Sequence, residues 1–212
     1  MFTSPWEKGR LAPFMSSTLS FITIAGLKKS GKTTVAEALI GELVRRGSRV
    51  ASVKSMLHGE FRLEPEGTDT RRHLAAGAEA TLAFSAEEDA VFARRSAAGP
   101  RERLERWLPP GVDWVVCEGQ LPDVPSDRVV LCLARVKDFA EALAVRGLEA
   151  RAVVAVSGVA ASGAAASGPD RAAPLPVPLP VPLLDVHDRR DLARLADIVL
   201  AGRAGAGIRS DP

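Results

Sequence analysis

Apolar and polar positions alternate along the chain between short runs typical of strands and longer segments typical of amphipathic helices. Residues 21–25 are apolar and partly β-branched, which predicts a strand buried on both faces. Residues 32–46 carry apolar side chains at helical spacing, and Gly47 ends this predicted helix. The same reasoning predicts strands at 49–53, 80–84, 114–118, 129–133 and 151–156, and helices at 68–76, 101–107, 138–145 and 188–200.

This order of elements predicts an α/β fold whose mostly parallel strands are joined by right-handed helical crossovers. Because no internal repeat is evident, we expect a single domain over residues 19–212, preceded by an irregular leader at 1–18. Within it, residues 160–182 are rich in Ala, Gly and Pro, which predicts a flexible connector. Residues 183–201 predict a closing strand and helix, with Asp188 capping the helix.

Composition narrows the class of protein. The formal net charge of +2 is too small to indicate a nucleic-acid or membrane partner. The first 14 residues lack the apolar core of a signal peptide, and no run approaches the roughly 18 apolar residues of a membrane span. Cys117 and Cys132 lie in predicted buried strands and have no zinc-site spacing. We therefore expect a cytoplasmic protein without disulfides.

Residues 26–33 match the phosphate-binding pattern G-x-x-x-x-G-K-[ST] in full. The two glycines let the backbone curl around a phosphate so that several N–H groups point inward. Lys32 would reach the β- and γ-phosphates, and the Thr33 hydroxyl would bind Mg²⁺. The motif lies between a predicted buried strand and an amphipathic helix, so we predict a P-loop NTPase three-layer fold. The nucleotide-binding positions in this segment are Gly26, Lys28, Lys29, Ser30, Gly31, Lys32, Thr33 and Thr34.

A magnesium site needs a further carboxylate, normally at the end of a neighbouring strand. Glu118 is the candidate, because it follows an apolar strand and precedes Gly119. It would hold the metal through water or polarise the attacking water. Lys32 and Glu118 are therefore the candidate catalytic residues, and Thr33 and Glu118 are the candidate metal ligands. The alternative for Glu118 is a solvated acid at a strand end.

The residues do not reveal which base would be bound. The Asn-Lys-x-Asp motif of many guanine-specific GTPases is excluded, because the sequence contains no Asn. The equivalent late strand runs into Ser157-Gly158 instead. Gln120 is a candidate for orienting a water, and Arg71 and Arg72 are candidate in-chain arginine fingers. An ordinary solvated face is the alternative for both arginines.

The segment after the second predicted strand carries a group of polar side chains. In a P-loop fold this segment leaves the sheet at its carboxyl edge, where ligands bind. Its residues His58, Asp69, Arg72 and His73 therefore indicate recognition of a second anionic ligand. The two histidines are too few and too far apart to predict a metal site. A structural or surface role is the alternative for each of them.

Several segments together resemble the MobB family, the molybdopterin-guanine dinucleotide biosynthesis adaptor proteins. The matching segments are residues 26–34, Val53-Lys54 with His58-Gly59 after them, residues 69–78 and residues 116–119. The phosphate-binding loop is shared by many families, whereas Asp-Thr-Arg-Arg-His followed by Ala-Gly-Ala at this distance is much more specific. The resemblance covers residues 21–120 and extends loosely to the closing helix.

The resemblance implies a GTP-binding adaptor that hydrolyses GTP weakly, forms a homodimer and uses Mg²⁺. It also implies a partner, the guanylyltransferase that joins GMP to molybdopterin, and hence a role in molybdenum cofactor biosynthesis. By position, Lys32 and Thr33 would hold phosphate and Mg²⁺, and Glu118 would support the metal. The sequence departs from the family at Ser157-Gly158, where a Ser-Asp is usual, and at Gln120, where an aromatic residue is common.

Two other functions remain open at this point. A P-loop small-molecule kinase would use Asp69 or Glu118 to position an acceptor hydroxyl and Arg72 to clamp the phosphoryl group. Its arginine-rich lid would have to come from residues 94–106. A nucleotide-switched metallochaperone or scaffold is the third reading, although the low Cys and His content speaks against metal delivery.

Overall fold

The computed structural model describes residues 19–56, 65–125, 127–162 and 181–201. The leader at 1–18, His58 and most of the predicted connector therefore lie outside the described residues. The chain divides into two compact units: residues 56–99 form the smaller one, and the segments on either side of them form the larger one. No helix in the described parts is long and apolar enough to cross a membrane.

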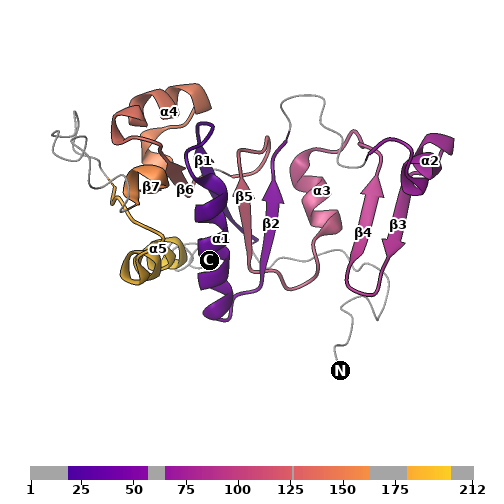
Figure 1. The fold of residues 1–212 in the computed structure, drawn as a ribbon, viewed down its shortest axis with the longest axis horizontal. Helices are drawn as coiled ribbons and strands as arrows, with labels where there is room; N and C mark the ends of the chain where they lie inside the picture. Colours follow the sequence, from indigo (N-terminus) through magenta and orange to yellow (C-terminus); the bar gives the residue numbers. More distant parts are fainter. Residues whose placement is uncertain (1–18, 57–64, 126, 163–180, 202–212) are drawn as a thin grey trace, which may run out of the picture. The chain divides into compact units, whose positions relative to one another are not determined.

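The larger unit is built on one parallel sheet of five strands in the order β2-β5-β1-β6-β7 (Figure 1). Its strands are β1 (Ser20–Gly26), β2 (Val50–Lys54), β5 (Trp114–Glu118), β6 (Val129–Cys132) and β7 (Val153–Ser157). The central strand β1 is almost entirely buried, in agreement with its unbroken apolar sequence. Ligand sites in such sheets form at the carboxyl ends of the strands, next to the strand where the chain order reverses. In this sheet that strand is β1.

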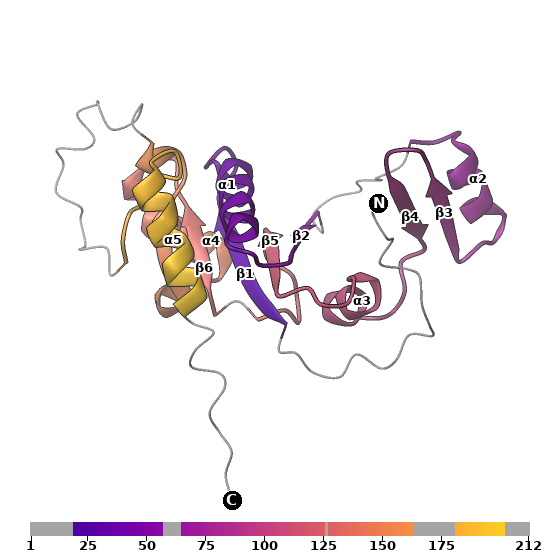
Figure 2. The same ribbon diagram turned by 90° about the horizontal axis from the view of Figure 1, so that it is seen from below.

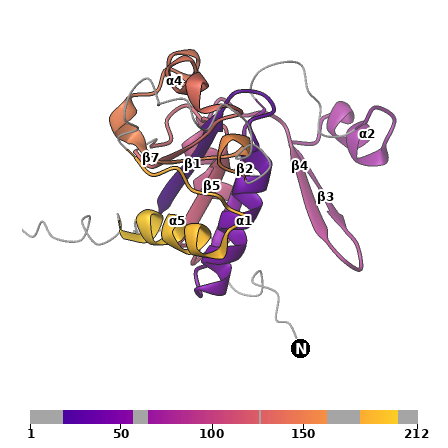
Figure 3. The ribbon, with the colours of Figure 1, turned by 60° about the vertical axis from the view of Figure 1, so that its left-hand side comes forward.

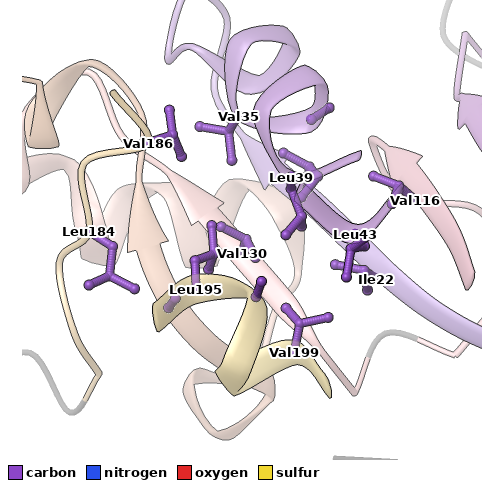
Figure 4. Close-up of a cluster of buried hydrophobic side chains, with 14 of the residues drawn as sticks. Ile22, Val35, Leu39, Leu43, Val116, Val130, Leu184, Val186, Leu195 and Val199 are labelled. Atoms are coloured by element: carbon purple, nitrogen blue, oxygen red, sulfur yellow. The ribbon is translucent and has the colours of Figure 1, made fainter. Parts of the chain in front are cut away.

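Helices cover both faces of the sheet, which gives the three layers predicted from the sequence. They are α1 (Lys32–Arg45), α3 (Pro100–Trp107), α4 (Phe139–Arg146) and α5 (Arg189–Ala201), with single 3-10 turns at Val136–Asp138, Ala150–Ala152 and Val159–Ala161. Figure 3 shows α1 and α5 lying side by side on one face. Leu39 of α1 and Leu195 of α5 pack with Ile22 of β1 in the main core (Figure 4).

The opposite face of the sheet carries two smaller clusters. The side chains of β1 alternate between the faces, so Phe21 and Ala25 point away from the main core. Phe21 packs in a cluster that includes Leu104 of α3, whereas Ala25 packs in one that includes Ala142 of α4. Both cysteines of the chain are free and buried within strands, as the sequence predicted.

Ion pairs also join α1 to α5. Glu42 is only 8% exposed and accepts hydrogen bonds from Arg45 and from Arg46. Arg46 in turn pairs with Asp197 of α5 at 2.5 Å and donates to the Ala193 carbonyl at 2.8 Å. Two arginines hold the pKa of Glu42 down at about 2, mainly through the hydrogen bond from Arg45 and then that from Arg46.

The smaller unit contains α2 (Asp69–Ala76) and an antiparallel pair, β3 (Ala80–Phe84) and β4 (Asp89–Ala93) (Figure 2). The Thr68 hydroxyl caps α2 by accepting a hydrogen bond from the Arg71 N–H. At the other end, Arg94 donates a hydrogen bond to the Leu74 carbonyl. The chain turns between the strands at Ser85, whose hydroxyl accepts from the N–H groups of the next turn residues.

The prediction that strand 80–84 belongs to the parallel sheet is wrong. β3 pairs with β4 instead, its immediate neighbour in sequence. β4 was not predicted, because the chain enters it through the acidic stretch Glu87-Glu88-Asp89, which is typical of a loop. The stability of an isolated two-stranded sheet is marginal.

The single domain expected over residues 19–212 stays a prediction.

The other predicted elements are found with small shifts of their ends. The last strand begins at Val153, since Ala150–Ala152 form a 3-10 turn. The closing strand at 183 is reduced to one bridge between Leu183 and Val156. The closing helix is capped as predicted, because the Asp188 carboxylate accepts hydrogen bonds from the N–H groups of Arg190 and Asp191.

Candidate nucleotide-binding site

The 26–33 loop joins the carboxyl end of the central strand β1 to the start of α1. Its backbone takes positive φ values at Gly26, Lys29 and Gly31, so the chain curls tightly over a few residues. At Gly26 a Cβ atom would collide with the Cys132 carbonyl of the adjacent strand. Only glycine therefore allows β1 to pass this close to β6 while turning into the loop.

The connection after β7 supports the loop from outside. The Val159 N–H donates a hydrogen bond to the Ser30 carbonyl at 3.2 Å. Gly158 lies against the same carbonyl so closely that a Cβ atom would collide with it. The departure from the family pattern at Ser157-Gly158 thus has a structural consequence, because the glycine lets this connection pack directly on the loop.

The start of α1 offers unpaired backbone donors to an anion. The N-cap is Gly31, no side chain caps the helix, and no acidic residue lies in its first turn. The first N–H groups of a helix have no intrahelical acceptor and carry the positive end of the helix dipole. A phosphate group fits such an end. The loop and helix together therefore form a cradle with the chemistry of a phosphate site.

Lys32 is the cation of this cradle. Its Nζ donates to the Leu27 carbonyl at 2.6 Å, and the Ser30 hydroxyl donates to the same carbonyl at 2.9 Å. Burial lowers the pKa of Lys32, and the positive charge of Arg146 lowers it further, with a smaller contribution from Lys54. An ammonium group held half-buried beside other cations is stabilised by an incoming anion.

Thr33 and Glu118 form the candidate metal site. The Thr33 hydroxyl donates to Glu118 Oε1 at 3.0 Å, and Lys54 Nζ lies 3.4 Å from the other carboxylate oxygen. Lys54 and Glu118 end neighbouring strands in register, which brings them together at the carboxyl edge. Adjacent ligands around Mg²⁺ at 2.0–2.1 Å are about 3 Å apart. The Thr33 hydroxyl and the Glu118 carboxylate are oxygen ligands of the kind that Mg²⁺ takes, and their hydrogen-bonded separation of 3.0 Å is compatible with neighbouring positions around the ion.

The other predicted positions of the loop differ in their exposure. Lys28, Lys29 and Thr34 are exposed, whereas Gly26 and Ser30 are buried. The contacts of these residues with an anion remain predictions.

A family model described as molybdopterin guanine dinucleotide synthesis protein B matches residues 21–146, which is more than half of the chain. The chain belongs to the MobB family. The resemblance inferred from the sequence segments is thereby confirmed.

Relatives of known name agree with this assignment. A Haemophilus influenzae protein described as molybdopterin-guanine dinucleotide biosynthesis adapter protein is 35% identical over 79 residues, which are 37% of this chain. The chain spans 44% of the length of that relative, so the match covers less than half of it.

Two solved structures have the same fold. The crystal structure of Bacillus subtilis MobB is similar with a TM-score of 0.58 and 21% identity, covering 85% of this chain and 98% of that one. A MobB homolog from Bacillus stearothermophilus gives a TM-score of 0.56 and 22% identity, again over 85% of this chain and 98% of the other. At this identity the likeness concerns the fold, and it confirms the predicted α/β sheet flanked by helices.

The residues predicted to recognise a second ligand lie in the smaller unit of this MobB-family chain. Asp69 and Arg72 form an ion pair at 3.2 Å in which both side chains are largely exposed. His73 is exposed on the same helix, and His58 lies outside the described residues. In this ion pair, the charges of Asp69 and Arg72 interact with each other. A role for these residues beside a nucleotide stays a prediction.

Two residues near the loop were not among the predicted site residues. The family resemblance includes Lys54 without giving it a role, although its position at a strand end is a usable signal. Arg146 donates from Nε to the Gly26 carbonyl at 3.0 Å. It is the last residue of a helix 120 positions further along the chain. No local pattern could have linked the two.

Proposed function

We propose that the chain binds GTP with Mg²⁺ at the 26–33 loop, hydrolyses it slowly, and serves as an adaptor in molybdopterin guanine dinucleotide biosynthesis. The observation that carries the proposal is the Thr33–Glu118 pair, 3.0 Å apart, directly beside a cationic loop on the central strand of a MobB-family fold. The family supports the pathway, and the loop supports the nucleotide.

Phosphate binding rests on the backbone and on Lys32. The open N–H groups at the start of α1 would donate hydrogen bonds to the β-phosphate, and Lys32 would leave the Leu27 carbonyl to contact the β- and γ-phosphates. Burial lowers the pKa of Lys32, and a phosphate beside the ammonium would offset this by favouring the charged form. The transfer of one hydrogen bond from a carbonyl to a charged phosphate is favourable.

Thr33 and Glu118 would hold Mg²⁺, with Glu118 acting directly or through water. When bound, Mg²⁺ neutralises charge that builds up on the β- and γ-phosphate oxygens during hydrolysis. Lys54 keeps Glu118 in place through its ion pair on the other carboxylate oxygen. Glu118 would also polarise the attacking water, with Gln120 as the candidate for orienting it.

The adaptor role concerns a partner and a second copy of the chain. We propose that the chain assists a guanylyltransferase that attaches GMP to molybdopterin, in the cytoplasm, and that it works as a homodimer. One face of the β3–β4 pair supports the dimer. Leu82 and Val91 face each other across the strands and are 55% and 44% exposed, and Phe84 beside them is 74% exposed. A second copy would remove this apolar surface from water.

The kinase alternative finds little support in its proposed lid. Arg101 and Arg106 form ion pairs with Glu105 and Glu102 within α3 itself. Arg94 is engaged with the Leu74 carbonyl. Arginines held in this way are not poised to close over a transferred phosphoryl group.

The proposal is tested by nucleotide titration with and without Mg²⁺, followed by affinity purification of a molybdopterin guanylyltransferase in the presence of GTP. We expect GTP to bind more tightly than ATP, Mg²⁺ to strengthen binding, and the transferase to be retained. Preference for ATP, or phosphate transfer to a small molecule other than water, would contradict the proposal and favour a kinase.

A further inference from the structure

Arg146 reaches from the end of α4 to the first turn of the 26–33 loop. Its Nε donates to the Gly26 carbonyl at 3.0 Å. The helix that carries it is anchored next to the loop, because Phe139 and Leu143 belong to the same apolar cluster as Leu27. This packing holds α4 against the loop, and Arg146 itself is only partly exposed.

Two cations thus hold consecutive carbonyls of one loop. Arg146 donates to Gly26 and Lys32 donates to Leu27. The two charges act on each other, since Arg146 follows burial as the main reason why the pKa of Lys32 is lowered. Holding like charges together costs free energy that an anion between or beside them would return.

The helix dipole alone does not explain this arrangement. A basic residue in the last turn of a helix interacts favourably with the dipole from any exposed rotamer. Arg146 instead crosses to another element, while Gly147 ends the helix with a left-handed φ of 58° and leads the chain away. Among the described residues, Arg146 makes no recorded hydrogen bond other than the one from Nε.

We propose that Arg146 is a second cationic ligand of the bound triphosphate, acting beside Lys32. The inference rests on the proposed function, because it adds a contact within the same site. Nε remains on the Gly26 carbonyl, and the two Nη groups donate to phosphate oxygens. Arginine suits this task because its planar fork offers several donors at once and keeps its charge. The chain would then supply in cis a cation that its loop motif does not contain.

Three substitutions separate a phosphate contact from a purely structural one. Arg146→Gln keeps a donor nitrogen at the position of Nε and removes the charged head. Arg146→Met keeps the length of the stem and removes both. Arg146→Lys keeps the charge and loses the Nε donor. Arg151→Gln is the control with the same charge change, because Arg151 is exposed at the opposite, amino-terminal end of β7.

The experiment measures affinity for GTP and for inorganic tripolyphosphate by calorimetry, with the melting temperature of the ligand-free protein as a check on folding. We expect Arg146→Gln and Arg146→Met to lower the affinity for both ligands by about tenfold or more, which is the effect of losing one charge-assisted hydrogen bond. Arg146→Lys should stay closer to the unmodified chain than either, and the Arg151 variant should bind normally.

Other outcomes overturn the inference in distinguishable ways. If Arg146→Gln binds both ligands like the unmodified chain, while Arg146→Met and Arg146→Lys bind them weakly, Arg146 only positions the loop. If all three bind normally, it has no role in binding. If the unmodified chain binds neither ligand, the proposed function fails together with this inference. Weak binding by Arg146→Gln and Arg146→Met, with Arg146→Lys less affected and the melting temperatures unchanged, supports the inference.

Discussion

Thr33 and Glu118 are 85 positions apart in sequence, yet the Thr33 hydroxyl donates to the Glu118 carboxylate at 3.0 Å. Thr33 belongs to the first turn of α1 and Glu118 ends β5, the strand next to β1. The parallel sheet brings both to its carboxyl edge, where ligands of α/β proteins bind. This one contact joins the loop motif to the only carboxylate that the sequence had marked as a metal ligand.

Removing the Glu118 charge tests the metal site. Glu118→Gln keeps an oxygen for the Thr33 hydroxyl and weakens attraction for a cation. We expect the Mg²⁺ concentration that half-saturates GTP binding to rise about tenfold or more, as for losses around metal sites generally. Glu141→Gln, on an exposed position of α4, is the control and should change nothing. An unaltered Mg²⁺ dependence in the Glu118 variant would exclude the carboxylate from the metal site.

Removing the Lys32 charge tests the phosphate site. Lys32→Met should weaken GTP binding by about ten- to a hundredfold, since charge-assisted contacts are lost. The melting temperature of the ligand-free protein should hold or rise, because burial already disfavours this ammonium, as its lowered pKa shows. Lys137→Met, at an exposed position, serves as control. Normal GTP affinity in Lys32→Met would remove the basis of the proposed function.

Substituting Gly158 tests whether the connection after β7 supports the loop. Gly158→Ala would force a methyl group against the Ser30 carbonyl, in addition to the strain of a positive φ. Gly47→Ala is the control for a positive φ alone, because its φ is 85° and no atom lies within 4 Å of the added Cβ. It should lose about 1–2 kcal/mol in urea unfolding from backbone strain and bind GTP normally. Gly158→Ala should lose more, since its φ of 92° and ψ of −156° lie in a region that essentially only glycine adopts, and it should also bind GTP weakly. Equal GTP affinities of the two variants would contradict the idea that the connection after β7 supports the loop.

The Glu42 cluster predicts a specific acid sensitivity. The pKa of Glu42 is about 2 in the folded protein, against an ordinary 4.5, so its ion pairs stabilise the fold above about pH 4.5. That contribution is lost as the pH falls toward 2. The melting temperature of Glu42→Gln should therefore lie below that of the unmodified protein at pH 7, and the gap should close between pH 4.5 and 2. Glu37→Gln, exposed on the same helix, should show no such gap.

The exposed face of the β3–β4 pair predicts the proposed dimer contact. A Leu82→Ser and Phe84→Ser double variant should shift the chain toward monomer in analytical ultracentrifugation, because both side chains are more than half exposed in the single chain. Val145→Ser removes a comparably exposed apolar side chain of α4 and should leave the mass unchanged. A dimer that survives the double variant, or a monomeric unmodified chain, would contradict the proposal.

Much of the larger unit was predictable because its signals are local. The run at 21–25 is apolar without interruption, as a strand covered on both faces must be, and the structure buries it. The 26–33 motif spans eight consecutive residues. Its place between a strand and a helix could therefore be predicted from the neighbouring sequence alone. Asp188 was recognised as a cap because its hydrogen bonds reach only two and three residues ahead.

The failures share a different physical cause. β4 was missed because its pairing with β3 stabilises a segment whose own composition disfavours a strand. β3 was assigned to the wrong sheet because alternation of elements carries no information on which strands pair. The contact between Arg146 and Gly26 was invisible because it joins two segments that only the packing of α4 brings together.

The kinds of chemical group at the candidate site follow from residue type and short spacing: a glycine-rich turn with a lysine and a threonine, and an acid at the end of an apolar strand. Which distant groups meet that turn depends on the fold. Strand order and register place Glu118 and Lys54 together, and the packing of α4 brings Arg146 to the loop. Side-chain contacts between segments depend on the folded path of the chain, and no local pattern encodes that path.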